Sequence, residues 1–312
     1  MADLTPRYPF DSSRSERMDP KLKIGGIIDT LVGYPMADSR RENAVYLAQA
    51  KDNESRNFLH PAGYMFKPDI LPPPLAKGQD KVAALVQEMD RWDVEIGLVH
   101  VEDDESAAHV LANPNRLVGC YFCDANQVMQ SVRDIGKYAA QGAIRAVSVF
   151  PAGLMPQVAI NDKKMYPVYA KCVELGLPMF CAAGVPGPRV PTACQHVELI
   201  DEVMYDFPEL VFVTRHGCEP WVDLMVKLMV KWPNLHFSTS GFAPKYYPEA
   251  VVRYANTRGA DRFVYGGYFA FGLTLERIMR ELPQLPLKPE IWPKFLRGNA
   301  LRILKLDGAN PR

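Results

Sequence analysis

The chain has 312 residues and carries 36 basic and 36 acidic side chains, so its formal net charge is zero. This balance excludes the strongly basic surface on which binding to nucleic acids or to anionic membranes depends. Hydrophobic residues make up 48% of the chain, which is enough for a large core. No apolar run is long enough to span a bilayer, and the N-terminal residues do not resemble a secretory signal, so we expect a cytoplasmic protein.

Short apolar segments alternate along the chain with longer amphipathic ones. The short segments are expected to be strands at 23–29, 94–101, 116–122, 143–150, 177–182, 210–215, 234–240 and 262–267. The amphipathic segments at 81–92, 128–140, 165–175, 196–207 and 222–232 are expected to be helices. Eight strands that alternate with helices predict an α/β protein with a single (β/α)₈ barrel domain.

The predicted barrel occupies residues 24–306, between an N-terminal arm at 1–23 and a C-terminal tail at 307–312. The segment 34–79 interrupts the alternation after the first strand. It is too long for an ordinary loop between a strand and a helix, and we expect it to cap the mouth of the barrel.

The six cysteines include Cys120 and Cys123, which have the CxxC spacing of many zinc sites. They fall at the end of an expected strand, where alternation directs them to opposite faces. No second CxxC is present, and disulfide frameworks are typical of small secreted proteins. The sequence therefore predicts reduced cysteines in the core.

Catalytic residues of (β/α)₈ barrels lie at the carboxyl ends of the strands, and three residues stand out there. His216 follows the sixth strand and is a candidate acid or base, although an ordinary buried histidine is the alternative. Tyr268 follows the last strand and can donate a hydrogen bond to a developing oxyanion, or simply fill space. Glu219 is a candidate to orient His216, or an acidic residue in the first turn of a helix.

The rest of the predicted mouth is apolar and aromatic, as expected for a pocket that binds a flat or hydrophobic small molecule. Arg189 and Arg215 are candidate anchors for a substrate carboxylate, although strand alternation would direct Arg215 outward, toward the helices. The aromatic residues expected to bind substrate are Tyr34, Phe150, Phe242, Tyr246 and Phe269.

Several longer strings resemble one known family. These are IIDTLVGYP (27–35), LVFVTRHG (210–217), SGFAPKYYP (240–248) and GNALRIL (298–304). Together they resemble the amidohydrolase-related family that includes aminocarboxymuconate-semialdehyde decarboxylase, over residues 24–306. The resemblance implies the barrel fold and suggests a homodimer.

The metal ligands of that family are largely missing from this sequence. The first-strand pattern D-x-H-x-H reads Asp29-Thr30-Leu31-Val32-Gly33, and the fifth-strand ligand position is Ala182. The aspartate expected after the eighth strand is Tyr268, and only the sixth-strand histidine remains, as His216. One ligand cannot hold a catalytic metal, so we predict no metal and no other cofactor.

Some members of the wider family work without a metal, among them 2-pyrone-4,6-dicarboxylate hydrolase and D-galactarolactone isomerase. The resemblance therefore implies a metal-independent hydrolase that acts on a lactone or a carbon–carbon bond of a small carboxylated cyclic or aromatic compound. A decarboxylase, another lyase or an isomerase is the alternative among enzymes. A ligand-binding pseudoenzyme is the alternative outside them.

Overall fold

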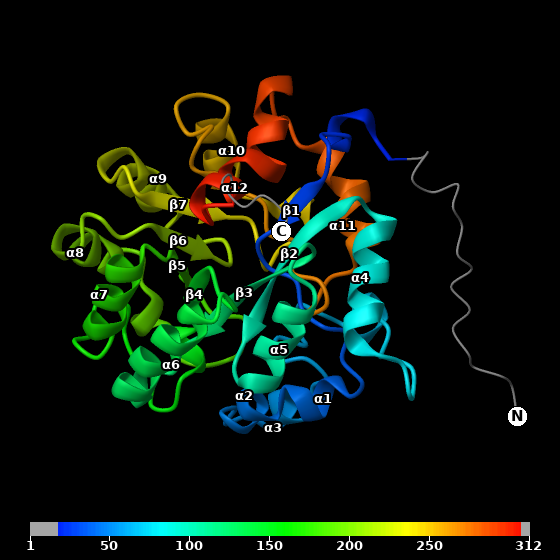
Figure 1. The fold of residues 1–312 in the computed structure, drawn as a ribbon, viewed down its shortest axis with the longest axis horizontal. Coiled ribbons are helices and arrows are strands. Elements are labelled where there is room, and N and C mark those ends of the chain that lie inside the picture. Colours follow the sequence, from blue (N-terminus) through cyan, green and yellow to red (C-terminus); the bar gives the residue numbers. More distant parts are fainter. Residues whose placement is uncertain (1–17, 307–312) are drawn as a thin grey trace, which may run out of the picture.

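The computed structural model describes residues 18–306, and its core is one sheet of eight parallel strands (Figure 1). Each strand pairs with its neighbours in the sequence. The strands are β1 (Ile27–Asp29), β2 (Val94–Val101), β3 (Leu117–Phe122), β4 (Ala146–Val149), β5 (Met179–Ala182), β6 (Phe212–Arg215), β7 (Leu235–Ser238) and β8 (Phe263–Val264). All eight lie within the predicted segments, and the barrel prediction is confirmed.

The two ends of the sheet meet just beyond β1 and β8. The main-chain N–H of Thr30 donates to the carbonyl of Tyr265 at 3.1 Å, and Val32 forms an isolated parallel bridge with Phe269. These contacts bring the segment after β8 against the segment after β1. Residues from both segments therefore reach the same end of the barrel.

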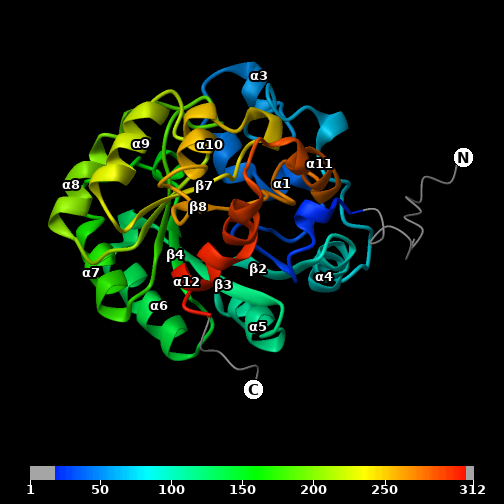
Figure 2. The same cartoon turned by 90° about the horizontal axis from the view of Figure 1, so that it is seen from above.

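Helices surround the strands on the outside (Figure 2). They are α4 (Lys81–Arg91), α5 (Asp104–Ala112), α6 (Val128–Ala140), α7 (Tyr166–Leu175), α8 (Leu199–Asp206), α9 (Val222–Lys231), α10 (Glu249–Ala255), α11 (Leu275–Glu281) and α12 (Asn299–Ile303). The five predicted helices are all present, and α6 has the predicted bounds. None of the helices in residues 18–306 is long and apolar enough to cross a membrane.

The strands are buried on both faces, which explains why their sequences are continuously apolar rather than alternating. One cluster fills the barrel interior and includes Leu98, Cys120, Phe180 and Val213. A larger cluster, which includes Cys123, lies between the strands and the helices. The two cysteines thus face opposite sides, as predicted, and all six cysteines are buried and free.

The segment 34–79 contains three short helices, α1 (Ser39–Glu42), α2 (Ala44–Ala48) and α3 (Asn53–Arg56), which gather at one end of the barrel (Figure 1). Gln49 follows α2, and its Nε2 donates to the carbonyl of Gly153 beyond β4 at 2.6 Å. We call residues 34–79 the cap.

Most of the predicted arm and all of the predicted tail, residues 1–17 and 307–312, lie outside the described residues. Within the remainder of the arm, Leu22 is fully buried in the core. The bounds of the arm, barrel and tail stay predictions.

Candidate active site

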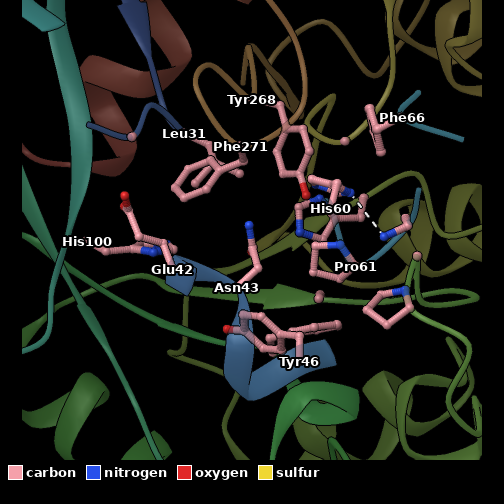
Figure 3. A pocket seen from close by; sticks show the side chains of 18 of the residues that line it. Leu31, Glu42, Asn43, Tyr46, His60, Pro61, Phe66, His100, Tyr268 and Phe271 are labelled. Atoms are coloured by element: carbon pink, nitrogen blue, oxygen red, sulfur yellow. Dashed lines mark hydrogen bonds between the residues drawn. The ribbon is translucent and has the colours of Figure 1, made fainter. Parts of the chain in front are cut away.

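A cavity of about 830 Å³ opens at the carboxyl ends of the strands. Its inner part is lined by residues at the ends of β1, β2 and β6 and after β8, and its outer part by the cap. Figure 3 shows Tyr268, Phe271 and Leu31 from the barrel on one side, and Asn43 and Tyr46 from the cap on the other. The size suits an organic molecule of one or two rings.

Arg215, the last residue of β6, lies at the floor of this cavity and is only 3% exposed. Its Nη2 donates to the carbonyl of Thr30 at 2.9 Å, and its Nη1 lies 3.2 Å from Nε2 of His100. Its Nε has no hydrogen-bond partner, and no carboxylate in residues 18–306 lies close enough to form an ion pair with it, although the charge of Asp29 acts on it at longer range. A buried cation is costly unless an anion neutralises it, so this floor favours an anionic ligand.

The prediction that Arg215 points outward is wrong. Val211 and Val213 face the barrel interior, and alternation places Arg215 on the same side. His216 has a φ of +67°, outside the strand region, so its side chain no longer alternates with that of Arg215. Both residues therefore line the cavity.

His100, in β2, is neutral in this environment. A guanidinium can only donate, so Nε2 of His100 accepts from Arg215 and the ring proton is on Nδ1. Burial, together with the charge of Arg215, lowers the pKa of His100 to about 3. The ring also packs against Phe122 and Phe271, with centroids 4.8 and 5.5 Å away.

His216 is oriented by Ser240, which follows β7. The Ser240 hydroxyl accepts from the main-chain N–H of His216 at 3.4 Å and lies 3.3 Å from Nδ1, to which it can donate. This arrangement leaves Nε2 without a partner among the described residues. Burial and the charge of Arg215 lower the pKa of His216 to about 3.

Glu219 lines the cavity but forms no hydrogen bond with His216 among the described residues, and the side chain that is bonded to His216 is Ser240. Burial raises the pKa of the Glu219 carboxyl group. Glu219 precedes Pro220 in the chain. Its carboxyl group forms no hydrogen bond or ion pair with residues 18–306.

Tyr268 faces His216, with the two rings edge to face and 5.3 Å apart. Its φ of +68° is unusual for a residue with a side chain, and such strain is commonly found at functional sites. Burial raises the pKa of the phenol, so Tyr268 keeps its proton and can act as a donor. Its role as a donor to a ligand stays a prediction.

Six of the residues assigned from sequence line the cavity together with Arg215. They are His216, Glu219, Tyr268, Tyr34, Phe150 and Phe242. Three others do not line it: Arg189, Tyr246 and Phe269.

Each of these three side chains is engaged elsewhere. Arg189 pairs with Asp52 at 3.1 Å and with Glu54 at 2.7 Å. Tyr246 is 57% exposed, and Phe269 is buried in the core with its main chain bonded to Gly33. Their positions do not support the prediction that they bind substrate in this cavity.

Several residues that line the cavity were not assigned a catalytic or binding role from the sequence. His100 lies in the predicted second strand, and Glu102 is the first residue after that strand. Tyr46 and His60 come from the cap. The sequence predicted that both residues belong to the cap, but not that they face the cavity. Tyr46 lies in a helix too short for periodicity to show an inward face, and His60 lies in a loop after α3.

The inner cavity does not fit a divalent metal. Leu31, Gly33 and Ala182 have no ligating side chain, and no group of three His, Cys, Asp or Glu residues in the described chain is arranged to hold a metal ion. The ring of Phe271 fills the space above Gly33, where an added Cβ would lie 2.7 Å from it. The guanidinium of Arg215 would also repel a second cation on this floor.

Comparison with known proteins identifies the family. The amidohydrolase family model matches residues 38–306. The chain belongs to this family. A comparison with curated proteins gave no match.

Solved structures of similar fold include an uncharacterised TIM-barrel protein from Bordetella bronchiseptica. It is 23% identical, with 91% of this chain and 100% of that one covered and a TM-score of 0.67. The 5-carboxyvanillate decarboxylase of Novosphingobium aromaticivorans, complexed with manganese and 4-hydroxy-3-methoxy-5-nitrobenzoic acid, is 15% identical (90% and 96% covered, TM-score 0.64). The 2,6-dihydroxybenzoate decarboxylase of Rhizobium is 12% identical (91% and 99% covered, TM-score 0.64). At these identities the likeness establishes the shared barrel.

Proposed function

We propose that this amidohydrolase-family protein is a metal-independent lyase that decarboxylates a small aromatic carboxylic acid. The observation that carries the proposal is the buried guanidinium of Arg215, which forms no ion pair with a carboxylate among residues 18–306 and faces an aromatic-lined cavity. An aromatic acid supplies both the missing negative charge and a flat ring for that cavity. The named functions of the similar decarboxylases support this choice over hydrolysis.

In the proposed complex the substrate carboxylate binds beside Arg215, and its ring lies among Phe122, Phe150, Phe242 and Phe271. The bound negative charge offsets the repulsion that Arg215 exerts on His216. The pKa of His216 then rises from its low value in the free protein, and Nε2, which faces the cavity without a partner, takes up a proton from solvent.

The chemical step requires one proton and releases CO₂. The imidazolium of His216 transfers its proton to the ring carbon that bears the carboxylate. The carbon–carbon bond then breaks, its electron pair restores the aromatic ring, and CO₂ leaves. His216 returns to its neutral form, while Tyr268 donates a hydrogen bond to negative charge on a ring oxygen substituent during the step.

Hydrolysis, the reaction expected first from the sequence, requires a stronger base than the two histidines of this site provide. It requires a base that removes a proton from water, and both histidines are held as weak bases by burial and by Arg215. Decarboxylation uses a bound anion to raise the basicity of His216 and needs no activated water. The site chemistry therefore agrees with the lyase alternative.

The test is release of CO₂ from carboxyl-labelled 2,6-dihydroxybenzoate and 5-carboxyvanillate, together with benzoates that carry one or two ring hydroxyl groups. We expect enzyme-dependent release from at least one of these acids, and loss of that release in His216→Asn. Tight binding of the acids with no release from any of them would contradict catalysis and support the ligand-binding alternative. Hydrolysis of a lactone panel without CO₂ release would support the hydrolase alternative.

A cytoplasmic location and a homodimer stay part of this proposal, as does the absence of a nucleic-acid or membrane partner. They derive from composition and from the family resemblance. Sedimentation of the purified protein gives the oligomeric state directly.

A further inference from the structure

The cap contributes a buried aromatic ring, Phe66, to the surroundings of Tyr268. Phe66 is only 8% exposed, and its ring centroid lies 5.8 Å from that of Tyr268 (Figure 3). The same ring covers Gly272, where an added Cβ would lie 2.8 Å from the nearest atom of the Phe66 ring. Gly272 belongs to the turn that Tyr268 begins, because its N–H donates to the Tyr268 carbonyl at 3.4 Å. Phe66 therefore packs both on the side chain of Tyr268 and on the turn that carries it.

Phe66 is held in place by other residues of the cap. Its main-chain N–H donates to the carbonyl of Ala62 at 2.9 Å, and its ring packs on that of His60, with centroids 4.6 Å apart. Nδ1 of His60 accepts from the main-chain N–H of Ala62 at 3.0 Å, and burial lowers the pKa of His60 to about 4, so this ring is neutral. The position of Phe66 is therefore set within the cap.

The barrel fixes the main chain of Tyr268 more firmly than its side chain. The N–H of Tyr268 donates to the carbonyl of Leu31 at 3.0 Å, and its φ of +68° is rare for a residue with a side chain. Its hydroxyl forms no hydrogen bond with residues 18–306. The direction of the ring is therefore set by packing, and three aromatic rings lie around it at 5.3–5.8 Å: His216, Phe271 and Phe66. Of these three neighbours, Phe66 is the one that the cap supplies.

We infer that Phe66 is a positioning residue, which holds the ring of Tyr268 so that its hydroxyl is directed at the bound substrate. The inference rests on the proposed function, in which Tyr268 donates a hydrogen bond during decarboxylation. A donor stabilises developing charge only from a fixed position, and a displacement of about 1 Å lowers a rate by up to about 100-fold. The cap thus takes part in catalysis through Tyr268.

The test is a double-variant cycle on the rate of decarboxylation. Tyr268→Phe removes the hydroxyl and should lower kcat about 100-fold. Phe66→Leu removes the ring that sets its position and should lower kcat about tenfold, while the dissociation constant for benzoate changes less than about threefold. In the Tyr268→Phe background, Phe66→Leu should lower kcat by less than about twofold, because no hydroxyl is left to position. Gly272→Ala, which displaces the Phe66 ring without removing it, should act like Phe66→Leu.

Phe58→Leu is the matched control, because Phe58 is a cap phenylalanine that packs on Gly63 and on Arg189 instead. Its kcat should equal that of the wild-type protein. Independent, multiplying losses from Phe66→Leu and Tyr268→Phe, or an equal loss in Phe58→Leu, would overturn the positioning role. An unchanged kcat in Tyr268→Phe would contradict the donor role of Tyr268 in the proposed function, and the inference with it.

A second measurement does not depend on turnover. In protein labelled with 3-fluorotyrosine, the ¹⁹F resonance of Tyr268 is the one that Tyr268→Phe lacks. We expect this resonance to broaden or split in Phe66→Leu and in Gly272→Ala, because the ring then samples more than one orientation, and to keep its line width in Phe58→Leu. A single sharp resonance in all variants would overturn the inference even if CO₂ is released. A broadened resonance without CO₂ release from any acid would uphold Phe66 as the support of Tyr268 and reject the decarboxylase.

Discussion

The floor and the mouth of the cavity are built from different parts of the chain and differ in charge. The floor comes from strand ends and presents Arg215 with two neutral histidines, all close to the buried core. The mouth comes from the cap and from the segment after β2, and it presents the carboxylate of Glu102 and the phenol of Tyr46. In the proposed function the barrel floor supplies the chemistry, and the cap with the segment after β2 forms the entrance.

The largest expected effect comes from removing the charge of the floor. Arg215→Met should lower kcat/KM roughly a thousandfold, because the carboxylate loses its buried partner. The same variant should be about as stable as the wild-type protein, since it removes a buried cation that forms no ion pair, while the longer-range attraction of Asp29 is lost with it. Steady-state kinetics and thermal melting measure the two effects. A variant that loses stability but keeps its activity would contradict the role of Arg215 as an anchor.

His216→Asn separates proton transfer from binding on the same floor. The asparagine can keep a polar contact with Ser240 but cannot carry the proton to the ring carbon. We expect kcat to fall about 100-fold or more, while the dissociation constant for a non-reacting benzoate changes by less than about threefold. Equal losses in binding and in kcat would assign His216 to binding instead.

Asp29, just behind the floor, should make stability depend on pH. Its Oδ1 accepts main-chain N–H bonds from Leu31 and Gly267, but its Oδ2 is buried without a partner, and burial raises its pKa from 3.8 to about 7. Because the pKa of Asp29 is raised in the folded state, the contribution of its protonated carboxyl group to the free energy of unfolding is complete below about pH 4. This contribution is lost as the pH rises toward 7.

The measurement is the free energy of unfolding of the wild-type protein and of Asp29→Asn between pH 4 and 8. The advantage of the wild-type protein should shrink with rising pH by up to about 1.4 kcal/mol per pH unit. Glu105→Gln, at the exposed mouth, is the control and should show a constant difference. A constant difference for Asp29→Asn as well would show that this carboxyl group does not titrate in the predicted range.

The smallest effect concerns the ring that fills the floor. Gly33→Ala places a Cβ 2.7 Å from Phe271 and should destabilise the protein by about 1–3 kcal/mol. The double variant with Phe271→Leu, a smaller side chain, should recover part of this loss. Chemical denaturation measures both, and additive losses would contradict the contact.

The sequence predicted the floor better than the mouth, for physical reasons. Strand segments such as 94–101 are apolar on both faces and are therefore recognisable without a structure, and the carboxyl ends of parallel strands must meet at one end of a barrel. This logic placed His216 and Tyr268 at the cavity. It misdirected Arg215, because the change to a positive φ at His216 is not visible in the residue pattern.

The cap follows no such rule. Its three helices have four or five residues each, which is too short for periodicity to show an inward face, so Tyr46 was not assigned. His60 lies in a loop after α3, where there is no periodicity to use. Arg189 was misplaced for a related reason. Its partners Asp52 and Glu54 lie in the cap, more than a hundred residues earlier in the chain, and only the folded chain brings them together.

The central claim is that an arginine-anchored, metal-free floor performs the decarboxylation. Its most direct test is the rate of CO₂ release by exhaustively chelated protein, on whichever aromatic acid the wild-type protein decarboxylates, with the metal content determined on the same sample. We expect an undiminished rate with far less than one zinc, iron or manganese ion per chain, and no gain when manganese is added. Loss of CO₂ release on chelation, restored by manganese, would contradict it.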